Sequence, residues 1–186
     1  HALVRRQRQM CIRDSLKHGA ISRGDKVKVE IDTERRQSIT CNHSATHLLH
    51  EALRLVLGDH VEQRGSMVDG DRFRFDFSHD TSVSAEEIRK VENIVNMEIM
   101  RNKKVVTTSM SMEEAQKKGA RALFGEKYGD VVRVVNIGEY FSVELCGGTH
   151  VNRSGEIGSV KVALETSVAS GIRLSLIHIS EPTRLC

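Results

Sequence analysis

The sequence predicts an α+β fold in which helices pack on antiparallel sheet. Three observations support this class. Residues 39–57 carry apolar side chains at helical spacing, whereas residues 72–78 alternate phenylalanine with polar residues, as a half-buried strand does. Expected helices and strands are interspersed, and short hairpin links join most of the strands. The helical stripe consists of Ala45, Leu48, Leu49, Ala52, Leu53 and Val56.

The first expected element is a strand at residues 24–31, which alternate polar and apolar side chains after a Gly-Asp turn. Residues 32–36 then lead into the long helix, and Gly58-Asp59 is expected to end it. The apolar positions of the strand are Val27, Val29 and Ile31.

A strand pair is expected at residues 60–68 and 72–78, around a turn at Asp69-Gly70-Asp71. In the second strand, three of the five phenylalanines share one face. We interpret that face as part of the hydrophobic core. Its residues are Phe73, Phe75 and Phe77.

Two further helices begin with a capping box, a Ser followed three residues later by Glu. Ser84 to Glu87 starts a helix that runs to about residue 102, and Ser111 to Glu114 starts one that stops at Gly119. The β-branched residues 105–108 form a short strand between them. A connection at residues 120–130 follows. The remaining strands are expected at residues 131–137, 140–145, 159–165 and 171–174.

Both ends of the chain differ in character from the rest. Residues 1–15 and 175–186 resemble peptides produced when sequencing-adapter DNA is translated together with a gene fragment. We expect both segments to be non-native and exclude them from fold reasoning, as for a tag. The underlying nucleotide sequence would test this expectation.

Composition excludes some classes of protein and leaves others open. The chain has 186 residues and a net charge of +3, which permits an anionic partner such as RNA without requiring one. No apolar run approaches the roughly 20 residues that cross a bilayer, and the basic first residues lack the apolar core of a secretory signal. Four cysteines without a CxxC pair indicate a reducing, cytoplasmic setting. Aromatic residues make up 4%, so a base-stacking sheet is not suggested.

The first candidate half-site is His43-x-x-x-His47 within the long helix. Residues four apart lie one turn above each other, so both imidazoles can reach one metal ion. A metalloprotease helix would carry glutamate after the first histidine, but Ser44 occupies that position, so the general base of that mechanism is missing. We interpret His50 as an outward or capping histidine and Cys41 as a small buried hydrophobe.

The second half-site is Cys146-x-x-x-His150, which follows an expected strand. The Gly147-Gly148 pair permits a tight turn with unusual dihedral angles. Thiolate and imidazole are preferred ligands of Zn²⁺, and four such groups fill a tetrahedral shell. The two half-sites together predict one zinc site.

These segments resemble the editing domain of alanyl-tRNA synthetase, and the likeness runs from about residue 19 to 173. The threonyl enzyme also combines HxxxH with CxxxH, but Gly147 and Thr149 favour the alanyl branch. The stretches that carry the resemblance are residues 42–50, 60–66, 74–79, 122–130 and 143–151.

The resemblance implies an HxxxH/CxxxH zinc-dependent editing domain at residues 36–174, preceded at 16–35 by the end of a small β-barrel subdomain. Such a domain hydrolyses the ester of tRNA(Ala) mischarged with serine or glycine, and the parent enzyme attaches alanine to tRNA(Ala) with ATP. The implied residues are His43, His47, Cys146 and His150 as zinc ligands, Gln63 in catalysis, and Gly147, Gly148 and Thr149 in substrate binding.

Two alternatives stay open: a free-standing trans-editing deacylase, and a non-catalytic, zinc-stabilised tRNA-binding module. The role of zinc is open as well. A catalytic zinc usually has three protein ligands and one open position, whereas four ligands are expected here. Either one ligand is displaced, or the metal orders the pocket and the substrate.

Overall fold

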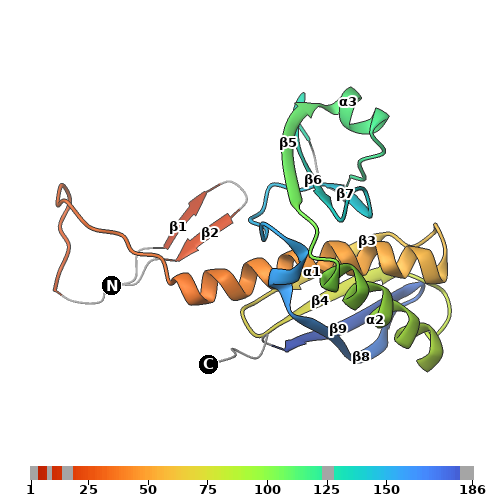
Figure 1. Cartoon of the computed structure of the whole chain (residues 1–186). Helices are drawn as coiled ribbons and strands as arrows, with labels where there is room; N and C mark the ends of the chain where they lie inside the picture. Colours follow the sequence, from red (N-terminus) through yellow and green to blue (C-terminus); the bar gives the residue numbers. More distant parts are fainter. Residues whose placement is uncertain (1–3, 8–9, 14–18, 123–127, 181–186) are drawn as a thin grey trace. The chain divides into compact units, whose positions relative to one another are not determined.

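The computed structural model describes residues 4–7, 10–13, 19–122 and 128–180, in two compact units, His1–Ile31 and Asp32–Cys186 (Figure 1). In the first unit, β1 (Val4–Gln7) and β2 (Met10–Arg13) form an antiparallel hairpin. This hairpin lies within the segment that was excluded from the sequence-based reasoning.

The strand predicted at residues 24–31 is wrong. These residues pair with no strand in the described part of the chain, and Val27, Val29 and Ile31 are 56%, 70% and 61% exposed. Alternation shows that a segment is suited to a half-buried sheet, but a strand also needs a neighbour that completes its backbone hydrogen bonds.

The second unit begins with α1 (Thr33–Leu57), whose Asp32 cap accepts a hydrogen bond from the Arg35 N–H. The helix ends at Gly58, which has φ +117°, as predicted. The second helix, α2 (Ala85–Met100), starts with the predicted capping box at Ser84 and Glu87. α1 contacts both α2 and the larger sheet.

The larger sheet is antiparallel and has the strand order β3-β4-β9-β8. Phe73, Phe75 and Phe77 on β4 are 0% exposed, which confirms the predicted core face. They pack in one hydrophobic cluster with Leu48, Leu49 and other residues of α1 and α2. The strands are β3 (Gln63–Val68), β4 (Arg72–Ser78), β8 (Ser159–Ala169) and β9 (Ile172–Ser180).

β9 continues past the boundary set from the sequence at residue 174. It pairs with β4 on one side and β8 on the other, and Ser175 and Ile177 are buried. In this structure the strand therefore includes residues that were excluded from the sequence-based reasoning. Whether those residues are native stays a prediction.

A smaller antiparallel sheet has the order β5-β6-β7. Its strands are β5 (Val105–Ser111), β6 (Val131–Ile137) and β7 (Ser142–Leu145). α3 (Met112–Lys117) starts with the predicted capping box at Ser111 and Glu114. A single 3₁₀ turn, η1 (Ser154–Ile157), precedes β8. The α+β class with antiparallel sheets is confirmed, and no helix among the described residues is long and apolar enough to span a membrane.

Candidate metal centre

Four metal-ligating side chains from two distant segments meet in one cluster. His43 and His47 lie one turn apart on α1, and Cys146 and His150 flank the glycine turn after β7. One ligand atom from each of the four lies within 4.8 Å of the others. The Sγ of Cys146 lies 3.4 Å from the Nε2 atoms of both His43 and His150. In the described part of the chain, this is the one group of three or more such side chains that can hold a metal ion.

A buried carboxylate orients one of these imidazoles. The Nδ1 of His47 lies 2.5 Å from the Oε2 of Glu144, which is 1% exposed. Nδ1–H donates to the carboxylate, and this leaves Nε2 as the free ligand atom of His47. That Nε2 is buried and has no hydrogen-bond partner among the described residues. A buried, unpaired nitrogen beside a thiol and two further imidazoles fits a metal ion such as zinc.

The interpretation of His50 as an outward or capping histidine is wrong. His50 is 5% exposed, its Nδ1 lies 2.8 Å from Glu144 Oε1, and its ring packs against Phe75 with centroids 5.4 Å apart. The centre of α1 is covered on several sides, so this face of the helix is not open to solvent. Cys41, expected to be a small buried hydrophobe, is half-buried and packs against the core, and its Sγ–H donates to the Glu156 carbonyl at 3.2 Å.

The electrostatic environment suits metal ligation. Burial alone would raise the pKa of the Cys146 thiol, but the three surrounding imidazoles, those of His150, His43 and His47, lower it to about 3. Burial lowers the pKa of His150 to about 4. Cys146 is therefore a thiolate and His150 a neutral imidazole at neutral pH, which are the ligating forms. Burial opposes a charge on His47, but the Glu144 carboxylate and the Cys146 thiolate together outweigh it and raise the pKa of His47 to about 10, so a metal ion that binds there displaces the proton from Nε2.

The glycine turn differs from its prediction. Neither Gly147 nor Gly148 has a positive φ, so the prediction of unusual dihedral angles for this pair is wrong. The requirement at Gly148 is space, because a Cβ there would overlap the His43 ring. A Cβ on Gly147 would meet nothing within 4 Å, and both Gly147 and Thr149 are exposed.

Arg133 on β6 holds this turn against the smaller sheet. Its Nη1 donates to the Cys146 carbonyl at 3.0 Å and also to the Gly148 carbonyl. The Cys146 N–H donates in return to the Arg133 carbonyl at 3.0 Å. The position of the Cys146 thiolate is therefore set by three hydrogen bonds between the turn and β6.

Gln63 does not join the cluster through any hydrogen bond in the described part of the chain. It begins β3, is half-buried, and its amide nitrogen donates to the Ser66 hydroxyl at 3.2 Å. Its proximity to the reacting groups stays a prediction.

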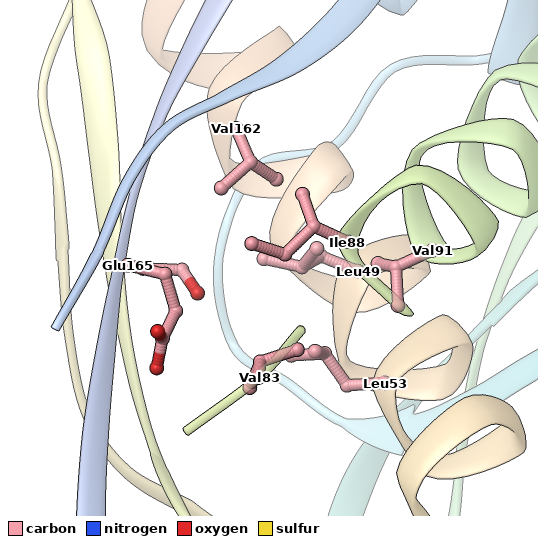
Figure 2. A pocket seen from close by; sticks show the side chains of 8 residues that line it. Leu49, Leu53, Val83, Ile88, Val91, Val162 and Glu165 are labelled. Carbon is pink, nitrogen blue, oxygen red and sulfur yellow. The ribbon is translucent and has the colours of Figure 1, made fainter. Parts of the chain in front are cut away.

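A small cavity in the core is not the functional site. It lies between α1, α2 and the larger sheet, and Figure 2 shows Leu49, Leu53, Ile88 and Val162 around it. Its volume is about 10 Å³, no more than one water molecule needs. Its lining includes none of the four clustered residues, so it offers no room for a substrate at that site.

Sequence reasoning missed Glu144, Arg133 and the role of His50. Glu144 carried a signal, because it is an acidic residue in the otherwise mostly apolar segment that leads to Cys146. Side chains two apart on a strand point to the same side, so a carboxylate two residues before a ligand is a candidate to orient its neighbours.

Comparison with known proteins first defines the class of domain. The family model described as the threonyl and alanyl tRNA synthetase second additional domain matches residues 132–174. This segment includes β6 except Val131, all of β7 and β8, and both side chains of the second half-site, Cys146 and His150.

Longer matches are found with alanine–tRNA ligases. The ligase of Saccharophagus degradans is 56% identical over 155 residues, 83% of this chain and 18% of the relative. That of Colwellia psychrerythraea is 57% identical over 156 residues, 84% and 18%. That of Rhodopseudomonas palustris is 52% identical over 169 residues, 86% and 19%.

The resemblance stated from the motifs is therefore confirmed: the chain corresponds to a segment of alanyl-tRNA synthetase that carries the domain shared with the threonyl enzymes. It spans about a fifth of the length of the relatives it matches.

Proposed function

We propose that this chain is the editing portion of an alanyl-tRNA synthetase and hydrolyses the ester that joins serine or glycine to tRNA(Ala). The supporting observation is the convergence of His43, His47, Cys146 and His150, from segments about a hundred residues apart, in a chain similar to alanine–tRNA ligases. A pocket for alanine discriminates poorly against smaller glycine and against serine, so a second, hydrolytic site is useful.

The donor set of three imidazoles and one thiolate favours Zn²⁺ as the ion held there. When bound, this ion supplies either polarisation of the ester carbonyl or activation of a water molecule. Cys146 and Glu144 contribute two negative charges that balance a divalent cation, while Glu144 holds the His47 ring in place.

The substrate is proposed to approach over the glycine turn. Gly147 and Thr149 are exposed directly beside two ligands, and Arg133 holds the turn in position. Gln63 is proposed to orient the scissile ester or the attacking water through its amide. Its side-chain hydrogen bond with Ser66 is exposed and easily exchanged for a substrate group.

The activity of the whole protein is a further part of the proposal. The relatives are named alanine–tRNA ligases, and we propose that the parent chain attaches alanine to tRNA(Ala), with ATP, in the cytoplasm. Residues 36–174 would form its editing domain and residues 16–35 the end of the preceding small β-barrel subdomain. The genomic reading frame separates this parent from a free-standing editing protein, because a synthetase has several hundred additional residues upstream.

The experiment is a deacylation assay with seryl-, glycyl- and alanyl-tRNA(Ala). We expect the seryl and glycyl esters to be hydrolysed well above the spontaneous rate, with alanyl-tRNA(Ala) largely spared. Cys146→Ala should abolish the activity, and Cys41→Ala, at the half-buried cysteine outside the cluster, should retain it. Binding of tRNA without hydrolysis would contradict the proposal and support a non-catalytic tRNA-binding module.

A further inference from the structure

Ser44 lies between the two histidines of the first half-site and is completely buried. Its hydroxyl makes three contacts. It donates to the Thr40 carbonyl at 2.9 Å one turn earlier, it accepts from the Val151 N–H at 3.1 Å, and it lies 3.3 Å from the Nδ1 of His150. Two of these contacts cross to the second half-site, more than a hundred residues later in the chain.

The hydrogen-bonding capacity of a hydroxyl decides the direction of the third contact. A serine hydroxyl has one hydrogen to donate and two lone pairs that accept. The Thr40 carbonyl takes the hydrogen, and the Val151 N–H occupies one lone pair. The remaining lone pair can only accept, so the Nδ1 of His150 must carry the proton.

This assignment determines which nitrogen of His150 is available. With the proton on Nδ1, the lone pair of the neutral ring is on Nε2. Nε2 is the atom that lies 3.4 Å from the Cys146 thiol, within the cluster. Ser44 therefore selects the tautomer that can ligate a metal ion.

Glu144, in the segment of the second half-site, orients a histidine of the first half-site. It lies two residues before Cys146, yet its carboxylate accepts from Nδ1–H of His47 in the first half-site. Each half-site thus supplies the group that orients a histidine of the other.

We infer that Ser44 and Glu144 are reciprocal positioning residues. Ser44 fixes the tautomer and ring orientation of His150, and Glu144 does the same for His47. The four side chains are therefore oriented for metal binding only when the two half-sites are in contact. This inference deepens the proposed function, since it assumes that the cluster holds a metal ion. It assigns to Ser44 a role that is different from the general base which glutamate provides at this position in metalloproteases.

The test compares Ser44→Ala with Ser38→Ala. Ser38 lies on the same helix, and its hydroxyl donates to the Glu34 carbonyl, four residues earlier, at 3.1 Å. Ser38 is half-buried, and among the described residues no hydrogen bond of its side chain reaches the second half-site. Both variants lose the same local hydrogen bond. Only Ser44→Ala loses the contacts with Val151 and His150.

The first readout is the tautomer of His150, measured by long-range ¹H–¹⁵N NMR on the metal-free protein with labelled histidine. We expect the Nδ1–H form in the parent protein and in Ser38→Ala, and a mixture of both tautomers in Ser44→Ala. The second readout is Zn²⁺ affinity from chelator competition. It should fall roughly 10- to 100-fold in Ser44→Ala, the usual effect of losing a group that orients a ligand, and stay unchanged in Ser38→Ala.

An unchanged His150 tautomer together with unchanged Zn²⁺ affinity in Ser44→Ala would overturn the inference. If Ser44→Ala does not fold, Glu144→Gln tests the other half of the arrangement, because a side-chain amide has one acceptor oxygen where the carboxylate has two. One of His47 and His50 must then lose its Nδ1 proton, and two unchanged Nδ1–H signals would overturn the reciprocal arrangement. Neither readout uses tRNA, so absent deacylation by the parent protein would contradict the proposed function alone.

Discussion

The imidazole of His43 lies against the α-carbon of Gly148, so closely that any side chain at residue 148 would overlap the ring. The contact joins the first turn of the HxxxH pair to the glycine turn of the second half-site. It explains why the turn carries glycine at this position although its φ angle is not in the left-handed region.

The two glycines of the turn should therefore respond differently to alanine. Gly148→Ala should displace His43 and weaken Zn²⁺ binding by at least tenfold, while Gly147→Ala, which adds a methyl group into open space, should leave binding unchanged. Chelator competition measures both affinities. Equal affinities in the two variants would show that the His43 position does not depend on the space at residue 148.

Removal of the Glu144 carboxylate should be strongly destabilising. Glu144→Ala leaves two buried imidazoles, those of His47 and His50, without their shared acceptor, and breaking a buried ion pair in this way costs about 3–5 kcal/mol. The control is Glu139→Ala, which removes an exposed carboxylate paired with Lys103, where a loss of about 0–1 kcal/mol is expected. Urea unfolding of the metal-free proteins measures both. A loss below about 1 kcal/mol for Glu144→Ala would count against this account of the pocket.

The Cys146 thiol should be ionised across the whole neutral range. Its pKa of about 3 lies below the ordinary value of 9.0, and a group with a lowered pKa holds its charge at every pH above the new value. The difference in ultraviolet thiolate absorbance between the metal-free parent protein and Cys146→Ser should therefore be constant from pH 5 to 10. Cys41 serves as an internal control, since burial raises the pKa of its thiol above the ordinary value. A Cys146 absorbance step between pH 8 and 9 would refute the assignment.

Gln63→His should separate catalysis from metal binding. Gln63 makes no described hydrogen bond to the cluster, so we expect an unchanged zinc content and a loss of seryl-tRNA(Ala) deacylation of at least tenfold. Ser66→Ala removes the hydroxyl that accepts from the Gln63 amide and should retain most of the activity. Loss of zinc in Gln63→His would instead give Gln63 a structural role.

The parts of the fold that the sequence predicted well are those with local causes. Capping boxes at Ser84 and Ser111 set where two helices start, Gly58 ends α1, and the phenylalanine alternation of β4 identifies its buried face. The sequence also picked out the four side chains that cluster, because spacing reveals which side chains share a helix face or a turn.

The errors concern properties that depend on distant partners. Residues 24–31 have the alternation of a strand but no described neighbour to pair with. His50 occupies a helix face that is buried only because Glu144 and Phe75 approach it from other elements. Gly148 is required by the His43 ring, about a hundred residues away, and not by its own dihedral angles. No local pattern contains this information.

The most direct measurement of the central claim is the rate of seryl-tRNA(Ala) deacylation before zinc removal, after zinc removal by a chelator, and after Zn²⁺ is added back. We predict loss of activity on removal, recovery with one equivalent of Zn²⁺ per chain, and no recovery in Cys146→Ala. An unchanged rate in protein from which the metal has been removed would contradict the claim that these four side chains form a zinc-dependent editing site.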